Sequence, residues 1–360
     1  MTSNSVLPSV EIAGRRIAAD APPFIVAELS ANHGGDLERA LRIIDLAADA
    51  GADAVKFQAY TADSLTLNSD RDGFTVTGES LWAGRRLYDL YQEAATPYSW
   101  FPELFAACRT RGLIPFASPF DRDAITMLQN LDAPAFKIAS FEAVDLDLVS
   151  ACASTGRPLI ISVGLCSAEE ISDAVTTARS AGSEDIILLQ CTSVYPAKTS
   201  EADLLTIPAL AERFGVLVGY SDHTTGTVTS AAACALGACL IEKHVIDARE
   251  PPTADSAFSL TGPDLKALVA ECREAWQARG TVRDGPTESE QASLAFRRSL
   301  YVCAPVAAGE KFTQANVKSI RPGFGLAPKH MPDVIGCHAS RAIHAGEPLA
   351  WEMISDRRDT

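Results

Sequence analysis

The feature that most constrains the fold of this chain is an alternation, repeated eight times, between short apolar runs and helical patterns. The clearest helical stretches, with apolar residues every three or four positions, are 36–50, 102–111, 167–181 and 264–279. The strand-like runs are 24–27, 54–57, 113–116, 135–138, 159–161, 185–189, 216–219 and 239–241. Eight such units over about 250 residues predict an α/β protein whose strands close into a (β/α)8 TIM barrel.

Local signals mark the ends of two of these helices. Asp36 can cap the first helix, and Gly51 follows its last turn. Ser167 and Glu170 have the spacing of a capping box. The runner-up fold is a doubly wound parallel sheet, which has the same alternation. The Gly-rich phosphate turn expected after its first strand is missing, so the barrel is favoured.

The two ends of the chain differ in style from the middle. Residues 1–22 contain two β-rich runs around a turn signal at Gly14, and we expect a hairpin that caps one end of the barrel. Residues 23–280 then form the barrel. Residues 281–296 are polar with Gly and Pro and are predicted to be a linker. Residues 297–360 are predicted to be a small β-rich domain, because short apolar runs and turns follow one another there.

Composition excludes some classes of function. The formal net charge of −15 argues against binding to nucleic acid or to an anionic membrane surface. The longest small-apolar run, 231–241, is far shorter than a membrane span. The first 20 residues do not resemble a signal peptide, so a cytoplasmic location is expected, with the nine cysteines as reduced thiols.

One connection is unusually long. It runs from Thr61 to Thr96 and is rich in aromatic residues and arginine. Long connections in compact domains are often lids or binding loops, and the alternative is an extra surface helix. Both interpretations carry equal weight at this stage.

Polar residues stand at or just after the end of each predicted strand, where the chemistry of a TIM barrel takes place. Eight polar strand ends with three lysines and three histidines predict one polar cavity. These residues are Glu28, Asn32, His33, Lys56, Gln58, Ser118, Lys137, Ser140, Glu142, Ser162, Thr192, Ser193, Tyr195, Ser221, Asp222, His223, Thr224, Glu242, Lys243 and His244.

Two of the histidines have the spacing of a metal site. His223 and His244 follow consecutive strands, which lie about 4.8 Å apart in a sheet. Two imidazoles with open positions for water or substrate suit a Lewis-acid metal, whether manganese, zinc, cobalt or magnesium. By contrast, His330, His338 and His344 of the C-terminal region are expected to be surface residues.

Two lysines at strand ends predict an anion site. Lys56 and Lys137 supply positive charge, and hydroxyl groups that can donate hydrogen bonds stand at the neighbouring strand ends. A phosphate group needs this combination of charge and donors. The alternative is a structural ion pair of Lys137 with Glu142 or Glu28.

Several motifs taken together resemble the sialic acid synthase family. They are AELSANHGG (27–35), VKFQAYTADS (55–64), PFASPFD (115–121), FKIASFE (136–142), CTSVYPA (191–197), GYSDHTTG (219–226), IEKHV (241–245) and DSAFSL (255–260). The segments RRSLYV (297–302) and NVKSIRPGFGL (316–326) are similar to the SAF domain of that family, an antifreeze-like β-clip. The first motif and residues 81–97 are most similar to the pseudaminic branch, whereas Gly34, Ser118 and residues 251–254 depart from the usual family pattern.

The resemblance implies a condensation of phosphoenolpyruvate with an amino-sugar aldehyde and water, giving a nine-carbon 2-keto acid and phosphate. In the pseudaminic branch the sugar is 2,4-diacetamido-2,4,6-trideoxy-altrose. The neuraminic and legionaminic branches are the alternatives. More distant rivals are a Schiff-base aldolase using Lys137 or Lys243 and a non-catalytic carbohydrate- or ice-binding protein.

The resemblance also implies a role for each matching residue. Lys56 and Lys137 would contact phosphoenolpyruvate, and His223 and His244 would hold a divalent metal, foremost Mn²⁺, with Mg²⁺ or Co²⁺ as alternatives. Glu28 would act on the sugar or on the attacking water. The phosphate would be lined by Ser118, Ser140, Ser162, Ser193 and Ser221, and the sugar would be positioned by Gln58, Glu142, Tyr195 and Asp255. Arg321 of the SAF domain would reach the partner's site in a domain-swapped homodimer.

Overall fold

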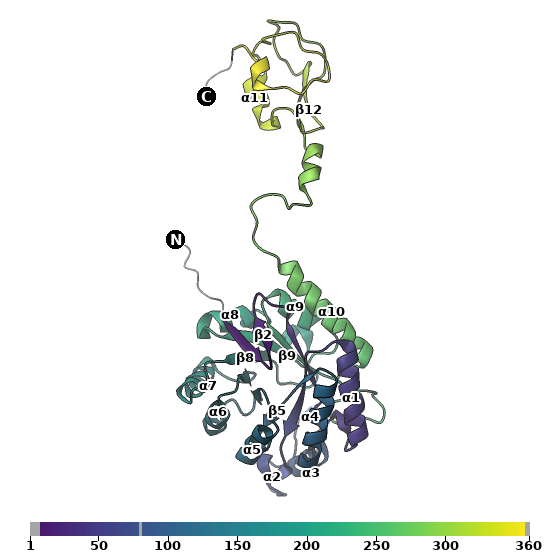
Figure 1. Ribbon diagram of the computed structural model, residues 1–360, viewed down its shortest axis with the longest axis vertical. Helices are drawn as coiled ribbons and strands as arrows, with labels where there is room; N and C mark the ends of the chain where they lie inside the picture. The colour runs from purple at the N-terminus through teal and green to yellow at the C-terminus, as the bar shows by residue number, and fades with distance from the viewer. Residues whose placement is uncertain (1–7, 79–80, 357–360) are drawn as a thin grey trace. The chain divides into compact units, whose positions relative to one another are not determined.

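The computed structural model describes residues 8–78 and 81–356, and it divides the chain into two compact units, up to residue 280 and from residue 281 on. In the first unit, eight parallel strands form a closed barrel in the order β10-β3-β4-β5-β6-β7-β8-β9, with helices around it (Figure 1). The predicted TIM barrel is therefore confirmed, and the doubly wound alternative is wrong because the first and last strands pair.

Each barrel strand is followed by one main helix. The strands are β3 (Phe24–Glu28), β4 (Ala54–Ala59), β5 (Ile114–Pro119), β6 (Phe136–Ile138), β7 (Leu159–Ser162), β8 (Ile186–Cys191), β9 (Leu217–Asp222) and β10 (Leu240–His244). The helices are α1 (Leu37–Ala50), α4 (Phe101–Thr110), α5 (Arg122–Asn130), α6 (Leu146–Ala153), α7 (Ala168–Ser180), α8 (Thr206–Phe214), α9 (Val228–Ala235) and α10 (Gly262–Arg279).

The expected end signals are present. Asp36 accepts a hydrogen bond from the backbone N–H of Glu38, and Gly51 ends α1 in the left-handed conformation. Ser167 and Glu170 form a reciprocal capping box at the start of α7. These caps satisfy backbone groups that a helix end would otherwise leave unpaired.

The interior of the barrel has two zones, because side chains of a strand alternate between its two faces. Near the amino ends of the strands the inward residues are apolar, and they form one buried cluster with Phe24, Val26 and Leu240 among its members. The outward residues belong to a second cluster shared with the helices. Farther along the same strands the inward positions become polar, as at Glu28 and Glu242.

A hairpin closes the apolar end. Strands β1 (Ser9–Ile12) and β2 (Arg15–Ala18) pair antiparallel around a turn at Ala13 and Gly14, both with positive φ. Residues Val10, Ile12 and Ile17 pack into the apolar cluster inside the barrel. Within the described residues, the hairpin expected for residues 1–22 is thus present.

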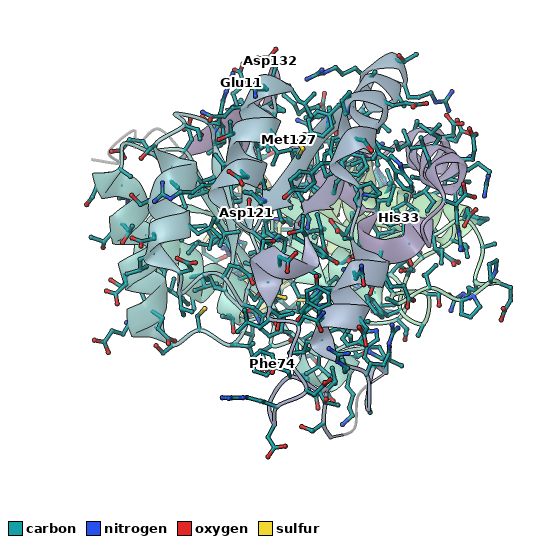
Figure 2. The ribbon with its side chains drawn as sticks, turned by 90° about the horizontal axis from the view of Figure 1, so that it is seen from below. Glu11, His33, Phe74, Asp121, Met127 and Asp132 are labelled. Carbon is teal, nitrogen blue, oxygen red and sulfur yellow. The ribbon has the colours of Figure 1, made fainter. Side chains whose placement is uncertain are left out.

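The long connection after β4 lies at the other end. It holds the short helices α2 (Ala62–Leu65) and α3 (Leu87–Ala94), followed by the 3₁₀ helix η2 (Tyr98–Trp100). Figure 2 shows Glu11 of the hairpin and Phe74 of the connection at opposite edges of the molecule. Two other 3₁₀ turns follow barrel strands, η1 (Ser30–His33) and η3 (Thr199–Glu201).

The second unit has a small core of its own. Strands β11 (Ser299–Val302) and β12 (Val317–Ile320) pair antiparallel, and Leu300, Phe312 and Leu349 are among the buried residues. The remaining elements are η4 (Gln291–Phe296), η5 (Pro328–His330), α11 (Met331–Val334) and η6 (Trp351–Met353). In the described part of the chain, no helix combines the length and apolar character that a membrane span needs.

Candidate active site

Four buried charged side chains form one network inside the polar zone of the barrel. Lys137 Nζ donates to both carboxylate oxygens of Glu242, at 3.2 and 3.1 Å. Lys56 Nζ lies 3.6 Å from Glu242 Oε1 and 2.7 Å from Glu28 Oε2. These residues are no more than 4% exposed. The predicted ion-pair partners of Lys137 were Glu142 or Glu28, whereas the observed partner is Glu242.

The network keeps two ammonium groups close together. Burial lowers the pKa of Lys56, but the carboxylates of Glu242 and Glu28 outweigh burial and raise it above its ordinary value. At Lys137 burial prevails and lowers the pKa. Burial raises the pKa of Glu242, but Lys137 and Lys56 outweigh it and hold this pKa well below its ordinary value. An ionised Glu242 thus gathers two donors that an anionic ligand can share.

Hydroxyl groups lie next to the ammonium groups. Ser118 Oγ accepts a hydrogen bond from Lys56 Nζ at 3.4 Å. Ser221 Oγ donates to Glu242 Oε1 at 3.2 Å. Both serines are buried, so their hydroxyls have no bulk water as a partner.

Three more of the predicted hydroxyls come from β6, β7 and β8. Ser140 Oγ accepts from the backbone N–H of Gly164 at 3.2 Å. A Cβ at Gly164 would lie 2.5 Å from Ser193 Oγ and 3.0 Å from Ser140 Oγ, so glycine allows the loop to approach both hydroxyls. Within residues 8–78 and 81–356, the buried Ser162 hydroxyl has no hydrogen-bond partner, which leaves it free for a ligand.

The two predicted metal ligands lie face to edge. The ring centroids of His223 and His244 are 5.4 Å apart. His223 Nδ1 lies 3.0 Å from the carbonyl oxygen of Thr192, and His244 Nδ1 lies 3.3 Å from Asp255 Oδ2. Since Nδ1 of each ring faces an oxygen, Nε2 is the nitrogen that remains for a ligand.

This donor set fits a divalent metal. Metal-binding histidines are usually oriented by an oxygen acceptor on the other ring nitrogen, as Thr192 and Asp255 provide here. No group of three or more His, Cys, Asp or Glu side chains in the described ranges is arranged to hold a metal. Water and substrate oxygens would therefore complete the coordination, as a Lewis-acid site requires.

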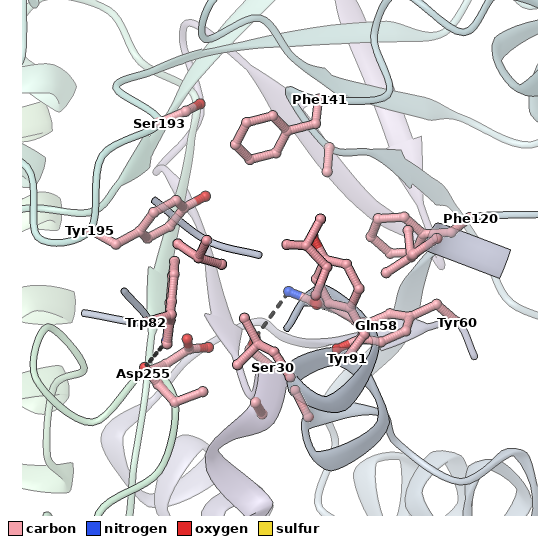
Figure 3. Close-up of a pocket in the computed structure, with 18 of the residues that line it drawn as sticks. Ser30, Gln58, Tyr60, Trp82, Tyr91, Phe120, Phe141, Ser193, Tyr195 and Asp255 are labelled. Carbon is pink, nitrogen blue, oxygen red and sulfur yellow. Dashed lines mark hydrogen bonds between the residues drawn. The ribbon is translucent and has the colours of Figure 1, made fainter. Parts of the chain in front are cut away.

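A cavity of about 510 Å³ opens at this end of the barrel. Its polar lining includes Ser30, Gln58, Glu142, His244 and Asp255. Gln58 Nε2 donates to Ser30 Oγ at 3.0 Å and to Glu28 Oε1 at 3.2 Å, which connects the cavity to the charged network. Figure 3 shows Gln58 and Ser30 between Trp82 on one side and Tyr91 on the other.

Tyr195 joins the cavity to the histidine pair. Its ring centroid is 4.3 Å from that of His223 and 5.6 Å from that of Trp82. Burial raises the pKa of Tyr195 well above its ordinary value, so the hydroxyl remains protonated and can donate a hydrogen bond. Burial likewise raises the pKa of Glu142, to about 7, and one of its oxygens has no partner among the described residues.

Lys243 lies outside the predicted cavity. It is on the outward face of β10, because its neighbours Glu242 and His244 point inward. Its Nζ lies 2.9 Å from Asp222 Oδ2 and donates to the Thr224 carbonyl oxygen. The prediction of three cavity lysines is therefore wrong, and this geometry leaves Lys243 no route to a sugar carbonyl.

His33, like Lys243, has a structural role. His33 Nδ1 accepts from the backbone N–H of Gly35 at 2.9 Å, and its Nε2 lies 3.1 Å from Thr96 Oγ1. Its neighbour Asn32 donates to the Val245 carbonyl oxygen and is fully buried. Of the three predicted histidines, His223 and His244 therefore remain at the polar cavity. The 3₁₀ turn η1, which carries Asn32 and His33, is hydrogen-bonded to the loops around it.

The remaining predicted residues lie in the second unit. Arg321 follows β12 and is exposed. His330 and His338 have acidic partners of their own, Asp333 at 3.1 Å and Asp356 at 2.7 Å. His344 is exposed and contributes its backbone N–H to Glu347.

Two features of the site were missed from the sequence. Glu242 stood among the polar strand ends but was given no role, although its spacing of two from His244 places both on one face of β10. The second is the set of individual residues of the connection that line the cavity, since only the connection as a whole was interpreted as a lid or binding loop. The connection contains helix α3 and also lines the site, so both of its predicted forms are present.

Two family models match the chain. Residues 43–284 match the model of the NeuB family, and residues 297–355 match the SAF domain. The chain is 43% identical over 333 residues to the pseudaminic acid synthase of Campylobacter jejuni, covering 92% of this chain and 96% of that protein. It is 43% identical over 335 residues to the pseudaminic acid synthase of Helicobacter pylori, covering 92% and 98%.

A solved structure shares the architecture. The N-acetylneuraminic acid (sialic acid) synthetase of Leptospira borgpetersenii, determined in complex with citrate, has a TM-score of 0.72 and 33% identity. The match covers 80% of this chain and 95% of that chain.

Proposed function

Because the chain belongs to the NeuB family of synthases, as its motifs predict, we propose that it condenses phosphoenolpyruvate with an amino-sugar aldehyde and water. The products are a nine-carbon 2-keto acid and inorganic phosphate. The sugar is 2,4-diacetamido-2,4,6-trideoxy-altrose, since relatives with 43% identity carry the name pseudaminic acid synthase. One observation carries the proposal: two buried lysines, a set of hydroxyls and a histidine pair lie beside one cavity.

Phosphoenolpyruvate occupies the deep part of this site. Its phosphate and carboxylate groups take hydrogen bonds from Lys56 and Lys137, which Glu242 holds together in the absence of an anion. Ser118, Ser140, Ser162, Ser193 and Ser221 supply further donors. Such fixed donors in a dry site stabilise charge without the reorganisation that water would require.

The sugar aldehyde occupies the cavity between Gln58, Glu142, Tyr195 and Asp255. His223 and His244 would hold a divalent metal, in the first place Mn²⁺, which would supply Lewis-acid chemistry at the aldehyde oxygen. Tyr195 packs against His223 and fixes the orientation of that ring. Gln58 lines the cavity and donates to Glu28, so this carboxylate would lie between the two substrates.

The bond changes balance as follows. Carbon 3 of phosphoenolpyruvate attacks the aldehyde carbon, and the aldehyde oxygen gains a proton to become a hydroxyl. Water adds to carbon 2 and loses a proton, for which Glu28 is the nearby carboxylate. The bond from carbon 2 to the phosphate oxygen then breaks, the proton of the new hydroxyl on carbon 2 passes to the departing phosphate, and the ketone remains. Lys56 and Lys137 stabilise the charge on the departing phosphate.

Phosphate release tests this proposal. The protein is incubated with phosphoenolpyruvate and the altrose-configured sugar, or with the precursors of the neuraminic and legionaminic acids, each with and without Mn²⁺. We expect sugar-dependent release of phosphate, fastest with the altrose-configured sugar and with metal. If no sugar releases phosphate, the enzyme assignment is wrong, whereas preference for another precursor would correct only the sugar.

The metal assignment has its own test. In His244→Ala the site loses one of two protein ligands, and we expect turnover with Mn²⁺ to fall by about 100-fold or more, because several kcal/mol of transition-state stabilisation depend on the metal. Calorimetric titration should show weaker Mn²⁺ binding by the purified variant. Unchanged turnover in metal-free buffer would exclude the metal role.

The SAF unit supplies the last proposed contact. We place Arg321 of one subunit at the sugar site of a second copy in a domain-swapped homodimer. Arg321→Ala should therefore raise the Michaelis constant for the sugar about tenfold and leave that for phosphoenolpyruvate nearly unchanged. An equal rise in both constants would contradict this role, and so would a monomer in sedimentation analysis.

A further inference from the structure

We propose that six side chains from the described part of the connection after β4 form an apolar wall that selects the sugar by its methyl groups, so that deoxy and acylated sugars are preferred to fully hydroxylated ones. This inference rests on the proposed function and assigns the choice of sugar to a part of the chain. The apolar wall consists of Leu65, Val76, Trp82, Leu87, Leu90 and Tyr91, which all line the cavity.

The six residues lie on both sides of the cavity, with Trp82 opposite Tyr91 (Figure 3), and their chemistry differs from that of the barrel residues in the same lining. None of the six side chains carries a formal charge, whereas Glu142, His244 and Asp255 on the barrel side can all carry one. Five of the six are partly exposed, and only Leu90 is buried. An apolar side chain that lines a cavity while keeping exposed surface gains from contact with an apolar group of a ligand.

The wall is held at several points. Trp82 Nε1 donates to the carbonyl oxygen of Ala254 at 3.1 Å, which joins the wall to the loop that carries Asp255. The backbone of Val76 and Arg85 is hydrogen-bonded at 2.8 Å. Leu87 N donates to the Phe74 carbonyl oxygen at 2.9 Å. A wall fixed in this way offers a defined surface to a ligand.

Aromatic contacts complete the surface. The ring centroids of Tyr91 and Tyr60 are 6.1 Å apart, and those of Tyr60 and Phe120 are 5.3 Å apart. Figure 3 shows these three rings together on one side of the cavity and Trp82 with Tyr195 on the other. The space between them suits a ligand with a polar edge toward the barrel and methyl groups toward the rings.

This arrangement makes a prediction about sugar chemistry. The proposed sugar carries a methyl group at carbon 6 and two acetyl methyl groups. A hydroxyl group in their place would lose its hydrogen bonds to water when the sugar binds. Among the six wall side chains, only the indole N–H of Trp82 and the hydroxyl of Tyr91 are polar groups that could replace those bonds. Apolar pockets discriminate at such positions by about 10- to 100-fold.

Two wall variants test the inference. Val76→Thr places a hydroxyl on the wall with little change of shape, and Leu87→Asn places an amide there. The matched control is Leu67→Asn, because Leu67 lies in the same connection, is 67% exposed and is absent from the cavity lining. Values of kcat/KM are measured for the altrose-configured sugar and for two analogues. One analogue carries a hydroxyl group on carbon 6, and the other has a hydroxyl in place of the 4-acetamido group.

We expect the wild type to prefer the parent sugar to both analogues. Val76→Thr or Leu87→Asn should reduce that preference at least tenfold for one analogue, with the Michaelis constant for phosphoenolpyruvate unchanged, while Leu67→Asn keeps it. Unchanged preference in both wall variants, or no preference in the wild type, would overturn the inference and leave the synthase assignment intact. If no sugar supports phosphate release, the proposed function and this inference fail together. Thermal unfolding midpoints verify that all variants are folded.

Discussion

Buried ion pairs lie on both the outer and the inner face of the barrel, and the two sets differ in how completely they are satisfied. On the outer face, Asp222 accepts hydrogen bonds from Thr224, Thr229 and Ser230 and is paired with Lys243. On the inner face, Lys56 and Lys137 share Glu242, while the neighbouring Ser162 hydroxyl has no partner among the described residues.

The difference separates a structural pair from a ligand site. Both sets are buried and charged, so neither burial nor charge distinguishes them. The outer carboxylate already has several protein donors, so it needs no further hydrogen bond from a ligand. The inner set retains donors that only a ligand can satisfy, since unpaired buried polar groups are costly. Removal of a lysine should therefore affect stability on the outer face and catalysis on the inner face.

The largest effect is expected on the outer face. Lys243→Met leaves Asp222 buried without its cation, and we expect the free energy of unfolding to fall by about 3–5 kcal/mol. Urea denaturation measures this change, and the folded fraction should retain wild-type kcat. Lys198→Met is the control, because the Lys198 side chain is 78% exposed and should change stability by less than about 1 kcal/mol. A folded Lys243→Met protein without activity would contradict the comparison.

The inner face should show the opposite behaviour. Lys137→Met removes one of the two proposed donors to phosphoenolpyruvate, and we expect kcat/KM to fall by about 100- to 1,000-fold. The unfolding free energy should change less than in Lys243→Met, because Glu242 keeps Lys56 at 3.6 Å. Phosphate release and urea denaturation are measured on the same preparation, with the exposed Lys266→Met as control. Activity within tenfold of wild type would remove Lys137 from the site.

The third prediction concerns the pH dependence of stability that the buried His33 causes. Burial lowers the pKa of His33 from 6.5 to about 4. As the pH falls, His33 therefore becomes protonated at a higher pH in the unfolded chain than in the folded one. The contribution of His33 to stability is complete above pH 6.5, and it decreases by on the order of 3 kcal/mol as the pH falls to about 4. The free energy of unfolding, measured by urea denaturation between pH 7 and 4, should therefore decrease less with falling pH in His33→Asn than in the wild type. Equal pH dependence in the variant and the wild type would mean that burial does not lower the pKa of His33.

The fold was largely predictable from the sequence, because its repeating unit is local. Each apolar run became a barrel strand, and the predicted helices agree within two residues where end signals exist, as in α1 and α7. The strand ends were less accurate. The predicted run 54–57 continues as β4 to Ala59, and 239–241 continues as β10 to His244.

These errors have one physical cause. At the site the inward positions become polar while the backbone still pairs, as in the register of Gln58 with Ser118. A pattern based on hydrophobicity therefore ends before the strand does. The partner of Lys137 could not be predicted either, because Glu242 lies 105 residues away in the sequence. The outward position of Lys243 was predictable, since alternation with Glu242 and His244 fixes it.

The pairing of β3 with β10 has a consequence for how the protein is made. A ribosome delivers β3 early and β10 some 200 residues later, yet Glu28 and His244 stand opposite each other in the register of these two strands. Asn32 bonds to the Val245 carbonyl oxygen across 213 residues of sequence. Contacts so distant in sequence form only after most of the barrel has been synthesised. A chain that ends before β10 would thus lack His244 and the Glu242 that joins the two lysines, so the polar zone of the barrel can form only when the barrel closes.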